Sequence, residues 1–295
     1  MIDKLEMLIA LSRERHFGRA AEACHVTQPT LSSAIKALEE SLGTQLVLRG
    51  ARFIGLTPEG ERVLTRAKAI VAEARAMRSD VLTARDGVTG TLRLGVIPTA
   101  LASVHDLTRP FLTENPGARL RVLSLTSREI LERLADFEID AGLSYAAADL
   151  SHEHPPGFQV LPLYDETYAL VTQPAPDLPA TMGWAQLDRF ELSLLTPDMQ
   201  NRRIIDRHLA QAGLSVTPRI ESNSIVALIS HAGEGHAATI LPLRVATFFA
   251  QMRGLACIPL TGPEAVSTNV AFLLPPVGRR TLLLDSFVRS LPKAF

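Results

Sequence analysis

Several features are scarce in this sequence of 295 residues, and each scarcity excludes a class of protein. There are only two cysteines, Cys24 and Cys257, which lie far apart, so a disulfide framework is excluded and a reducing cytoplasm is expected. The formal net charge is −1 at pH 7, so bulk charge indicates neither a polyanionic nor a polycationic partner. The composition, 46% hydrophobic and 21% charged, is typical of globular domains, and the length allows two or three of them.

Long hydrophobic runs are also lacking. No stretch approaches the roughly 20 apolar residues that span a bilayer. The first residues, MIDKLEMLIALSRERHFG, place apolar side chains at helical spacing between charges and lack the apolar core and cleavage site of a signal peptide. We therefore expect a soluble, cytoplasmic protein with no membrane contact.

Residues 16–60 show the clearest pattern in the chain: a short helix, a tight turn and a second helix, followed by a hairpin. Thr27 is a favourable N-cap residue, and Pro29 falls in the first helical turn, where a missing N–H costs nothing. Gly43 is typical of the residue that ends such a helix. The apolar residues of this helix share one face, which we predict to be buried: Leu31, Ile35, Leu38 and Leu42.

The opposite face of that helix carries short polar groups and one cation, the chemistry that reads base edges and binds phosphates. Residues 45–48 and 53–56 predict two short strands, whose connecting tip holds two arginines suited to a minor groove or a phosphate. We therefore predict a DNA-binding head over residues 1–57, although an ordinary helical domain with solvated polar faces would show the same spacing. Because residues 1–90 are only mildly basic, affinity must come from a few well-placed cations and from dimerisation. The predicted DNA-binding residues are Arg19, Thr27, Gln28, Pro29, Thr30, Ser32, Ser33, Lys36, Arg49 and Arg52.

Residues 58–90 predict a linker helix and a hinge. The sequence Thr57-Pro58-Glu59 is a helix start, with a cap, a proline and an acid near the positive end of the helix dipole. The apolar residues that follow form a narrow seam, which suits a partner helix better than a broad core; packing on its own domain is the alternative. Two paired heads would also double the base contacts at a symmetric site, so we predict a dimer through this helix. The seam residues are Val63, Ala67, Ile70, Ala74, Met77 and Val81.

Residues 91–295 predict an effector domain of alternating strands and helices. The order strand, helix, strand, helix, strand over residues 91–144 indicates a parallel sheet with ligands at the carboxyl ends of its strands. A second such unit follows, and residues 269–274 predict a strand that returns to the first. We therefore predict two lobes, lobe I from residues 91–161 and 266–295 and lobe II from residues 162–265. Several predicted helix starts offer backbone N–H groups with a hydroxyl or amide, which favours an anion, although each alone is an ordinary cap.

The sequence HFGRAAEACHVTQPTLSSAIKALEESLGTQL, with LTPEG, resembles the winged helix-turn-helix of LysR-type transcriptional regulators. The two-lobed pattern resembles the periplasmic-binding-protein-like effector domain of the same family, so the resemblance covers essentially the whole chain. It implies an α/β fold made of a winged helix-turn-helix, a long linker helix and a two-lobed effector domain. It also implies double-stranded promoter DNA and a small-molecule effector as partners, self-association to a dimer and on to a tetramer, and RNA polymerase as a candidate further partner.

The resemblance further implies that four helix starts converge on a cleft between the lobes. The segments LLTPDMQNRRIIDRHLAQAGL and IESNSIVALI are similar to the cyanate-responsive branch of the family, in which the effector is a small anion. We therefore predict an anion such as cyanate, formate or a short carboxylate, with Arg202 adding a full positive charge. The predicted effector-binding residues are Pro98, Thr99, Ala100, Thr126, Ser127, Ser144, Thr196, Asn201, Arg202, Asn223 and Ser224.

Catalysis and transport are the alternative functions. Ser103, His105 and Asp106 lie too close in the sequence for a conventional catalytic triad, and no G-x-S-x-G motif is present. His152 and His154 could bind a metal, but the Pro-Pro-Gly that follows predicts a loop and no third ligand is near. A transport binding protein would need an export signal where this chain has its predicted head. We therefore predict that the chain is not an enzyme and holds neither a cofactor nor a metal.

Overall fold

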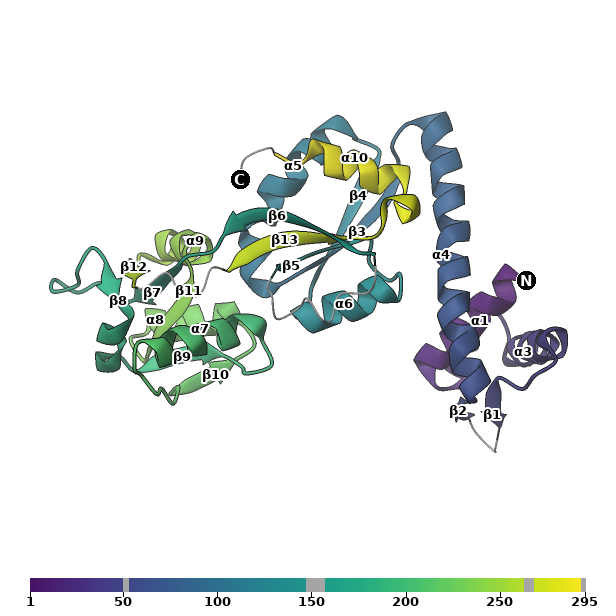
Figure 1. Cartoon of the computed structure of the whole chain (residues 1–295), viewed down its shortest axis with the longest axis horizontal. Coiled ribbons are helices and arrows are strands. Elements are labelled where there is room, and N and C mark those ends of the chain that lie inside the picture. Colours follow the sequence, from purple (N-terminus) through teal and green to yellow (C-terminus); the bar gives the residue numbers. More distant parts are fainter. Residues whose placement is uncertain (50–52, 147–156, 263–267, 293–295) are drawn as a thin grey trace. The chain divides into compact units, whose positions relative to one another are not determined.

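The computed structural model describes residues 1–49, 53–146, 157–262 and 268–292. The chain forms two compact units, Met1–Gly87 and Val88–Phe295 (Figure 1). Arg52 and the histidines at 152 and 154 lie outside the described residues.

The first unit is a three-helix head with a hairpin and a long helix. Its apolar core gathers residues from α1, α2, α3, the hairpin and the first part of α4. The turn between α2 and α3 places His25 at a φ of 55°, in the left-handed region, and Gly43 ends α3 at a φ of 66°. The elements are α1 (Ile2–Glu14), α2 (Phe17–Ala23), α3 (Gln28–Leu42), β1 (Val47–Arg49), β2 (Phe53–Leu56) and α4 (Pro58–Asp86).

The two parts of helix α4 differ in their burial. Leu64, Ala67 and Val71 are buried where α4 packs against α1, so the head's own core accounts for this part of the helix. Beyond it, Met77 and Val81 are 61% and 64% exposed within this single chain. The predicted seam is therefore divided, because Ala67 packs inside its own unit while the later seam residues remain at the surface.

The first lobe of the second unit is a five-stranded mixed sheet with the order β4-β3-β5-β13-β6. Strand β3 runs parallel to β4 and β5, whereas β13 runs antiparallel to β5 and β6. The strands are β3 (Gly90–Val96), β4 (Ala118–Ser124), β5 (Ala141–Tyr145), β6 (Gln159–Asp165) and β13 (Asn269–Leu274). The helices are the 3₁₀ helices η1 (Pro98–Ser103) and η4 (Val277–Arg279), with α5 (Val104–Glu114), α6 (Ser127–Ala135) and α10 (Leu282–Ser290).

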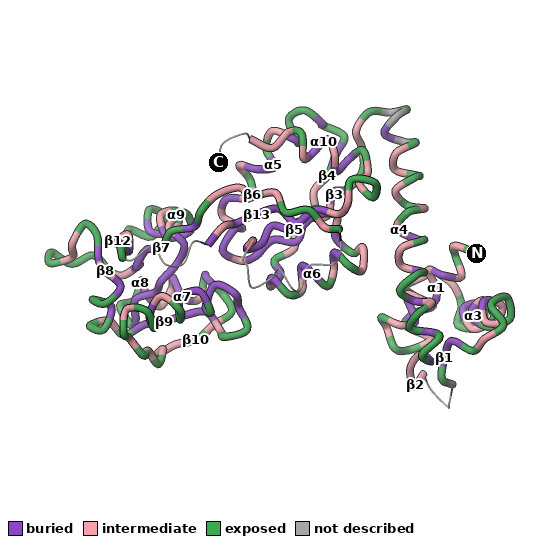
Figure 2. Tube along the Cα trace, in the orientation of Figure 1, coloured by how far each residue is buried: buried purple, intermediate pink, exposed green. Residues whose placement is uncertain are grey.

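The second lobe is a six-stranded sheet with the order β10-β9-β11-β7-β12-β8. Figure 2 shows its central strands buried, and β9 and β11 are buried along their whole length. The strands are β7 (Tyr168–Thr172), β8 (Met182–Gly183), β9 (Leu192–Leu195), β10 (Ile220–Ser222), β11 (Ala238–Pro242) and β12 (Ala256–Thr261). The helices are η3 (Trp184–Arg189), α7 (Gln200–Gln211), α8 (Ile225–Gly233) and α9 (Leu243–Arg253).

The structure differs from the sequence expectations at three places in this unit. Strand β6 continues to Asp165 while paired with β13, so residues 162–165 belong to the first lobe and not to the second. The first helix expected within residues 91–144 is divided into η1 and α5. Both sheets are mixed because β7 and β13 run antiparallel to their neighbours, which the local repeat of strand and helix does not reveal.

Candidate DNA-binding face and effector site

The start of α3 lies at the surface of the head. The Thr27 hydroxyl accepts the backbone N–H of Thr30 at 3.4 Å, and the two threonine hydroxyls are hydrogen-bonded at 2.9 Å. Gln28 and Pro29 are exposed beside them. The first turn of α3 therefore presents polar side chains at the positive end of the helix dipole.

The two faces of α3 differ as the spacing predicts. Leu31, Ile35 and Leu38 are buried in the core of the head, while Ser33 and Lys36 on the other side are exposed. Ser32 is half-buried. Leu42 was predicted to be buried, but it is the last residue of α3 and is 46% exposed. The Lys36 ammonium lies 3.8 Å from the Glu40 carboxylate, a surface pair that contributes little to stability. This face remains able to contact DNA.

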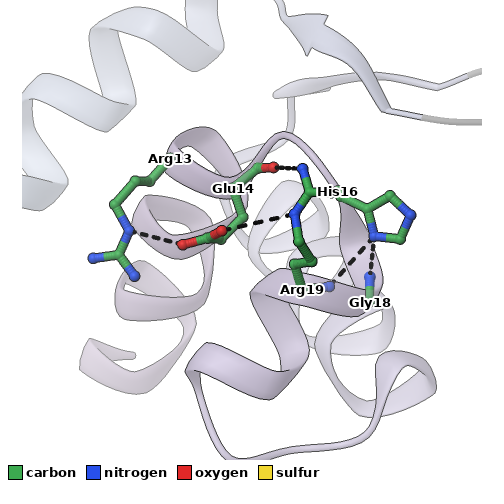
Figure 3. A network of polar contacts seen from close by, with 5 residues as sticks. All are labelled: Arg13, Glu14, His16, Gly18 and Arg19. Atoms are coloured by element: carbon green, nitrogen blue, oxygen red, sulfur yellow. Dashed lines mark hydrogen bonds and ion pairs between the residues drawn. The ribbon is translucent and has the colours of Figure 1, made fainter.

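Arg19 is held by local contacts at the start of α2 (Figure 3). Its guanidinium donates to the carbonyl oxygen of Glu14 at 2.7 Å and lies 3.9 Å from the Glu14 carboxylate. Glu14 is also paired with Arg13 at 3.1 Å. The ring of His16 caps the helix, because its Nδ1 accepts the N–H groups of Gly18 at 3.1 Å and Arg19 at 3.3 Å. Arg19 therefore keeps an exposed guanidinium whose position is set by Glu14.

The predicted wing is a two-stranded antiparallel hairpin. Val47 pairs with Leu56 and Leu48 with Gly55. Arg49 is the last residue of β1, and the tip with Arg52 lies outside the described residues.

The predicted effector residues lie at the ends of several elements of the second unit. Thr99 and Ala100 are in η1, Ser127 begins α6, and Ser144 lies in β5. Asn201 and Arg202 lie in the first turn of α7. Those six residues are buried, whereas Pro98, Thr126 and Thr196 are half-buried, and Asn223 and Ser224 at the start of α8 are exposed.

A series of hydrogen-bonded side chains connects predicted effector-binding residues from both lobes. The Tyr145 hydroxyl is bonded to the Thr99 hydroxyl at 2.9 Å and accepts from the Asn201 amide nitrogen at 3.1 Å. Thr99 and Tyr145 belong to the first lobe, and Asn201 belongs to the second. The structure thus joins Thr99 and Asn201 through a tyrosine that the sequence reasoning missed.

Four predicted residues carry buried polar atoms that have no hydrogen-bond partner among the described residues. These atoms are Ser127 Oγ, Ser144 Oγ, Thr196 Oγ1 and Asn201 Oδ1. Leaving a buried donor or acceptor unpaired costs about 1–3 kcal/mol, so such groups usually have a ligand or a water as partner. Several of the predicted residues therefore have unused hydrogen-bonding capacity.

Arg202 does not offer the free charge that the sequence predicts. Its guanidinium lies 2.8 Å from the Asp206 carboxylate and 2.6 Å from that of Glu221, and it donates to the Leu195 carbonyl at 2.8 Å. Two carboxylates more than offset the single positive charge. Arg202 therefore holds α7 against β9 and β10, and the donors left for an anion are hydroxyls, amides and backbone N–H groups.

Glu166 and Tyr168 are two further polar residues that the sequence reasoning missed. Both are buried beside Tyr145, and the Tyr168 hydroxyl donates to Glu166 Oε2 at 3.2 Å. Burial raises the pKa of Glu166 to about 8, against the opposing effect of the two neighbouring tyrosine hydroxyls. Tyr145 is the last residue of β5, so the rule that ligands bind at carboxyl ends of strands could have indicated it. No local pattern marks Glu166.

Comparison with known families identifies the chain. The family described as LysR substrate binding domain matches residues 85–295, and the bacterial regulatory helix-turn-helix protein, lysR family, matches residues 2–61. The chain belongs to the LysR family of transcriptional regulators. Members of this family are transcriptional regulators and not enzymes, and they bind small-molecule effectors in the substrate-binding domain.

Curated relatives and a solved structure agree with this assignment. The chain is 36% identical over 171 residues to a probable hydrogen peroxide-inducible genes activator of Mycobacterium xenopi, covering 58% of this chain and 88% of that protein. It is 33% identical over 252 residues to a protein of the same description from Streptomyces viridosporus, covering 81% and 76%. A full-length OxyR variant from Pseudomonas aeruginosa has the same fold, with a TM-score of 0.73 at 23% identity over 98% of this chain and 94% of that one.

The LysR assignment confirms the predicted fold class and the division into a helix-turn-helix and an effector-binding domain. The cyanate-responsive branch stays a prediction. Among the helices that the structure describes, none combines the length and apolar character needed to cross a membrane. Within the same residues, no group of three or more His, Cys, Asp or Glu side chains is placed to hold a metal ion.

Proposed function

We propose that this LysR-type regulator binds promoter DNA through α3 and the hairpin, and that a small anionic effector in the second unit modulates this binding. The effector part rests on the hydrogen-bonded side chains Thr99, Tyr145 and Asn201, which join both lobes. Asn201 Oδ1 and the hydroxyl of Ser144, the residue before Tyr145, are buried without a partner among the described residues. A ligand that completed those hydrogen bonds would contact both lobes and could change their arrangement.

The DNA contacts follow from the two faces of α3. Gln28, Thr30 and Ser33 are exposed on the side away from the core and are of the residue types that read base edges. Lys36 is suited to a phosphate, as are Arg19 and the arginines of the hairpin. One such helix makes few base contacts, so high specificity calls for a second head.

Helix α4 supplies a surface for that second head. Ile70, Met77 and Val81 recur at spacings of seven and four, and all three are exposed in the single chain. This spacing forms the narrow stripe typical of a helix that packs on a partner helix. We propose that two chains associate through this stripe; a tetramer and a contact with RNA polymerase remain predictions from the family.

The dimer has a direct test. Met77→Glu places a charge in the proposed stripe and should convert the dimer to monomer in sedimentation at micromolar concentration. Met252 on α9 is 68% exposed, so Met252→Glu is a matched control that should leave the dimer intact. A Met77→Glu protein with wild-type mass would contradict the proposal.

The chemical class of the effector follows from the hydrogen-bond donors that are still available to a ligand. Because two carboxylates already engage Arg202, an anion would be held by hydroxyls and by the first backbone N–H groups of α6. Such donors suit a small, singly charged anion; cyanate, formate and short carboxylates are the candidates.

A peroxide response is the second candidate function, because the relatives from Mycobacterium and Streptomyces are described as probable hydrogen peroxide-inducible genes activators. A peroxide-sensing cysteine reacts as a thiolate, which requires a lowered pKa. The chain has Cys24 and Cys257, both free thiols, and burial raises the pKa of each. Both thiols are therefore protonated at neutral pH, and this observation favours effector binding.

The effector proposal is tested by thermal shift with cyanate, formate, acetate and hydrogen peroxide. The anions should raise the melting temperature of the wild type, and Ser127→Ala should reduce this rise because it removes a buried hydroxyl without a protein partner. Ser230→Ala is the matched control, since that hydroxyl is exposed and bonded to the Val226 carbonyl at 2.9 Å. A response to peroxide alone, abolished by Cys257→Ser, would instead support the second candidate.

The DNA-binding proposal is tested by footprinting the full chain on the promoter region next to its own gene. We expect protection of a two-fold symmetric site, changed in extent or affinity by the anion that shifts the melting temperature. Uniform binding without sequence preference at moderate salt would contradict it.

A further inference from the structure

Two histidines meet at the end of α8, in the second lobe. His231 lies in the last turn of the helix, and His236 follows the turn that leads to β11. Their Nδ1 atoms are 3.5 Å apart. The centres of the two rings are 5.7 Å apart, with an angle of 50° between the ring planes. Neither residue is used in the proposed DNA-binding or effector-binding function.

The backbone holds this pair of side chains together. Helix α8 ends at Gly233, and Gly235 then adopts a φ of 72°, in the left-handed region that glycine favours. The N–H of Gly235 donates to the carbonyl of Ala232 at 3.2 Å, and the N–H of His236 donates to the carbonyl of His231 at 3.1 Å. These two hydrogen bonds form a Schellman motif, which brings the side chains on either side of the helix end into contact. Apolar residues frequently occupy these two positions, whereas this chain places an imidazole at both.

A neighbouring strand fixes the same turn. Gln173 directly follows β7, four of whose five residues are buried. Its amide nitrogen donates to the carbonyl oxygen of Gly233 at 2.6 Å, and a Cβ at Gly235 would lie 3.4 Å from the Gln173 amide. The two imidazoles are therefore held close together before any ligand binds, which favours binding because little ordering remains to be done.

The separation of the two nitrogens matches that of two ligands on one metal ion. Zn²⁺ binds histidine nitrogens at about 2.0–2.1 Å with tetrahedral angles, so two such nitrogens lie about 3.3–3.4 Å apart. The observed 3.5 Å differs from this by about 0.1–0.2 Å. As a hydrogen bond, 3.5 Å is at the long limit, so the pair gains little from its direct contact. The two nitrogens are therefore spaced better for a shared metal ion than for each other.

The surroundings of the pair admit a cation. It lies at the C-terminus of α8, the negative end of the helix dipole. His236 is exposed and His231 is half-buried, so an ion with its waters can reach both rings. Two full charges act on the same turn with opposite signs. The guanidinium of Arg253, on α9, would lie 3.3 Å from a Cβ at Gly233, and Glu234 is an exposed carboxylate between the two histidines in the sequence.

We propose that His231 and His236 chelate a late transition-metal ion such as Zn²⁺, Ni²⁺ or Cu²⁺ through their Nδ1 atoms. Imidazole suits these ions, whereas Mg²⁺ and Ca²⁺ prefer oxygen ligands. Each imidazole binds in its neutral form and keeps its proton on Nε2. Among the residues that the structure describes, no third His, Cys, Asp or Glu side chain completes the set, so water fills the remaining positions. The site therefore binds less tightly than a closed site with four protein ligands.

The test is isothermal titration calorimetry of the full chain with ZnCl₂, NiCl₂ and MgCl₂ at pH 7.5 in a buffer that does not bind metals. Zn²⁺ and Ni²⁺ should bind, and Mg²⁺ should give no binding heat. An ion that binds the folded protein more tightly than the unfolded chain also raises the melting temperature, so Zn²⁺ should do so where Mg²⁺ does not. The electron paramagnetic resonance spectrum of the Cu²⁺ complex should show coupling to two nitrogens.

Three variants address the pair itself. Loss of an outer partner of a metal ligand typically costs 10–100-fold in affinity, so loss of a ligand in His231→Ala or His236→Ala should weaken Zn²⁺ binding by at least about tenfold. Gly235→Ala keeps both histidines but strains the turn at its φ of 72°. It should therefore also weaken binding, which a site made of two independent surface histidines would not show.

Two further variants are controls. His105 is an exposed histidine of the first lobe whose ring lies 3.1 Å from the Asp106 carboxylate, and His105→Ala should keep the wild-type Kd for Zn²⁺. The double variant His152→Ala/His154→Ala removes the other two histidines that are close in the sequence, and it should also keep the wild-type Kd.

Each outcome bears on the pair directly. Weaker Zn²⁺ binding in both single histidine variants, with both controls unchanged, would support the proposal. Wild-type affinity in either His231→Ala or His236→Ala would overturn it, and so would Zn²⁺ binding that is lost only in the control variants. Both histidines have solvent access, so these variants should fold, and their melting temperatures without metal check this. The response to formate and cyanate tests the effector site separately, so the two proposals can fail independently.

Discussion

The two units of the chain place their proposed binding residues in opposite environments. In the head, Gln28, Thr30 and Ser33 are exposed, and the apolar core lies behind them. In the second unit, Thr99, Ser127 and Asn201 are buried, and the latter two carry polar atoms without a partner among the described residues. DNA is a large ligand that must reach its contacts from outside, whereas a small effector can be enclosed and can complete hydrogen bonds that the protein leaves open.

This difference predicts how mutations will act. Replacing an exposed residue that is proposed to contact DNA should change binding and leave folding stability nearly unchanged. Replacing a member of the buried cluster should change both, because the remaining partners lose hydrogen bonds in a dry environment.

The largest effect should come from the core behind the DNA-binding face. Ile35 is fully buried in α3, so Ile35→Ala should lower the free energy of unfolding of the head by about 2–5 kcal/mol. Leu42 on the same helix is 46% exposed, and Leu42→Ala should cost about 1 kcal/mol or less. Urea denaturation of both variants checks this contrast; equal losses would show that α3 is buried along more of its length.

The next effect concerns the dependence of stability on pH. The pKa of Glu166 rises from 4.5 to about 8 on folding, so its contribution to stability is fully present below pH 4.5 and is lost as the pH rises through 8. Each pKa unit corresponds to about 1.4 kcal/mol, so the loss is on the order of a few kcal/mol. Relative to Glu166→Gln, the wild type should become progressively less stable between pH 5 and 8 in denaturant titrations. A constant difference between the two proteins over that range would contradict the burial of an uncompensated carboxyl.

A smaller effect, on binding alone, is expected for Ser33→Ala. If Ser33 contacts a base edge, its removal should weaken binding to the specific site by about 1–3 kcal/mol. Stability should change by no more than about 0.5 kcal/mol, because the side chain is exposed. Competition binding with specific and random DNA measures the first quantity, and equal weakening on both DNAs would show that Ser33 does not read sequence.

The smallest effect is expected for Lys36→Gln. Its partner Glu40 is also exposed, so losing the ion pair should hardly change stability. Loss of one phosphate contact should weaken binding to all DNA sequences alike and reduce the slope of log K against log salt by about 1. A salt dependence identical to that of the wild type would mean that Lys36 makes no phosphate contact.

Local sequence patterns were sufficient to predict many individual helices and strands. Thr27, Pro29 and Gly43 placed the ends of α3. These patterns succeed because caps and helix periodicity depend on residues within one or two turns of each other. The strand expected over residues 269–274 was found with the same bounds.

Other features escaped the sequence reasoning because they depend on contacts between distant residues. Helix α9 and strand β12 were not anticipated, and β6 was assigned partly to the wrong lobe, since pairing with β13 decides its place. Arg202 was expected to offer a free charge, but the fold brings Glu221 to it from β10.

The amino-acid sequence by itself determined the family, the polar face of the helix proposed to bind DNA, and many of the strands and helices, because these depend on local patterns. Only the tertiary structure decided which polar groups meet. It placed Glu166 against Tyr168, joined Tyr145 to Thr99 and Asn201, and set two carboxylates beside Arg202. The reason is physical: hydrogen bonds and pKa values depend on distance and burial, which a linear sequence does not contain.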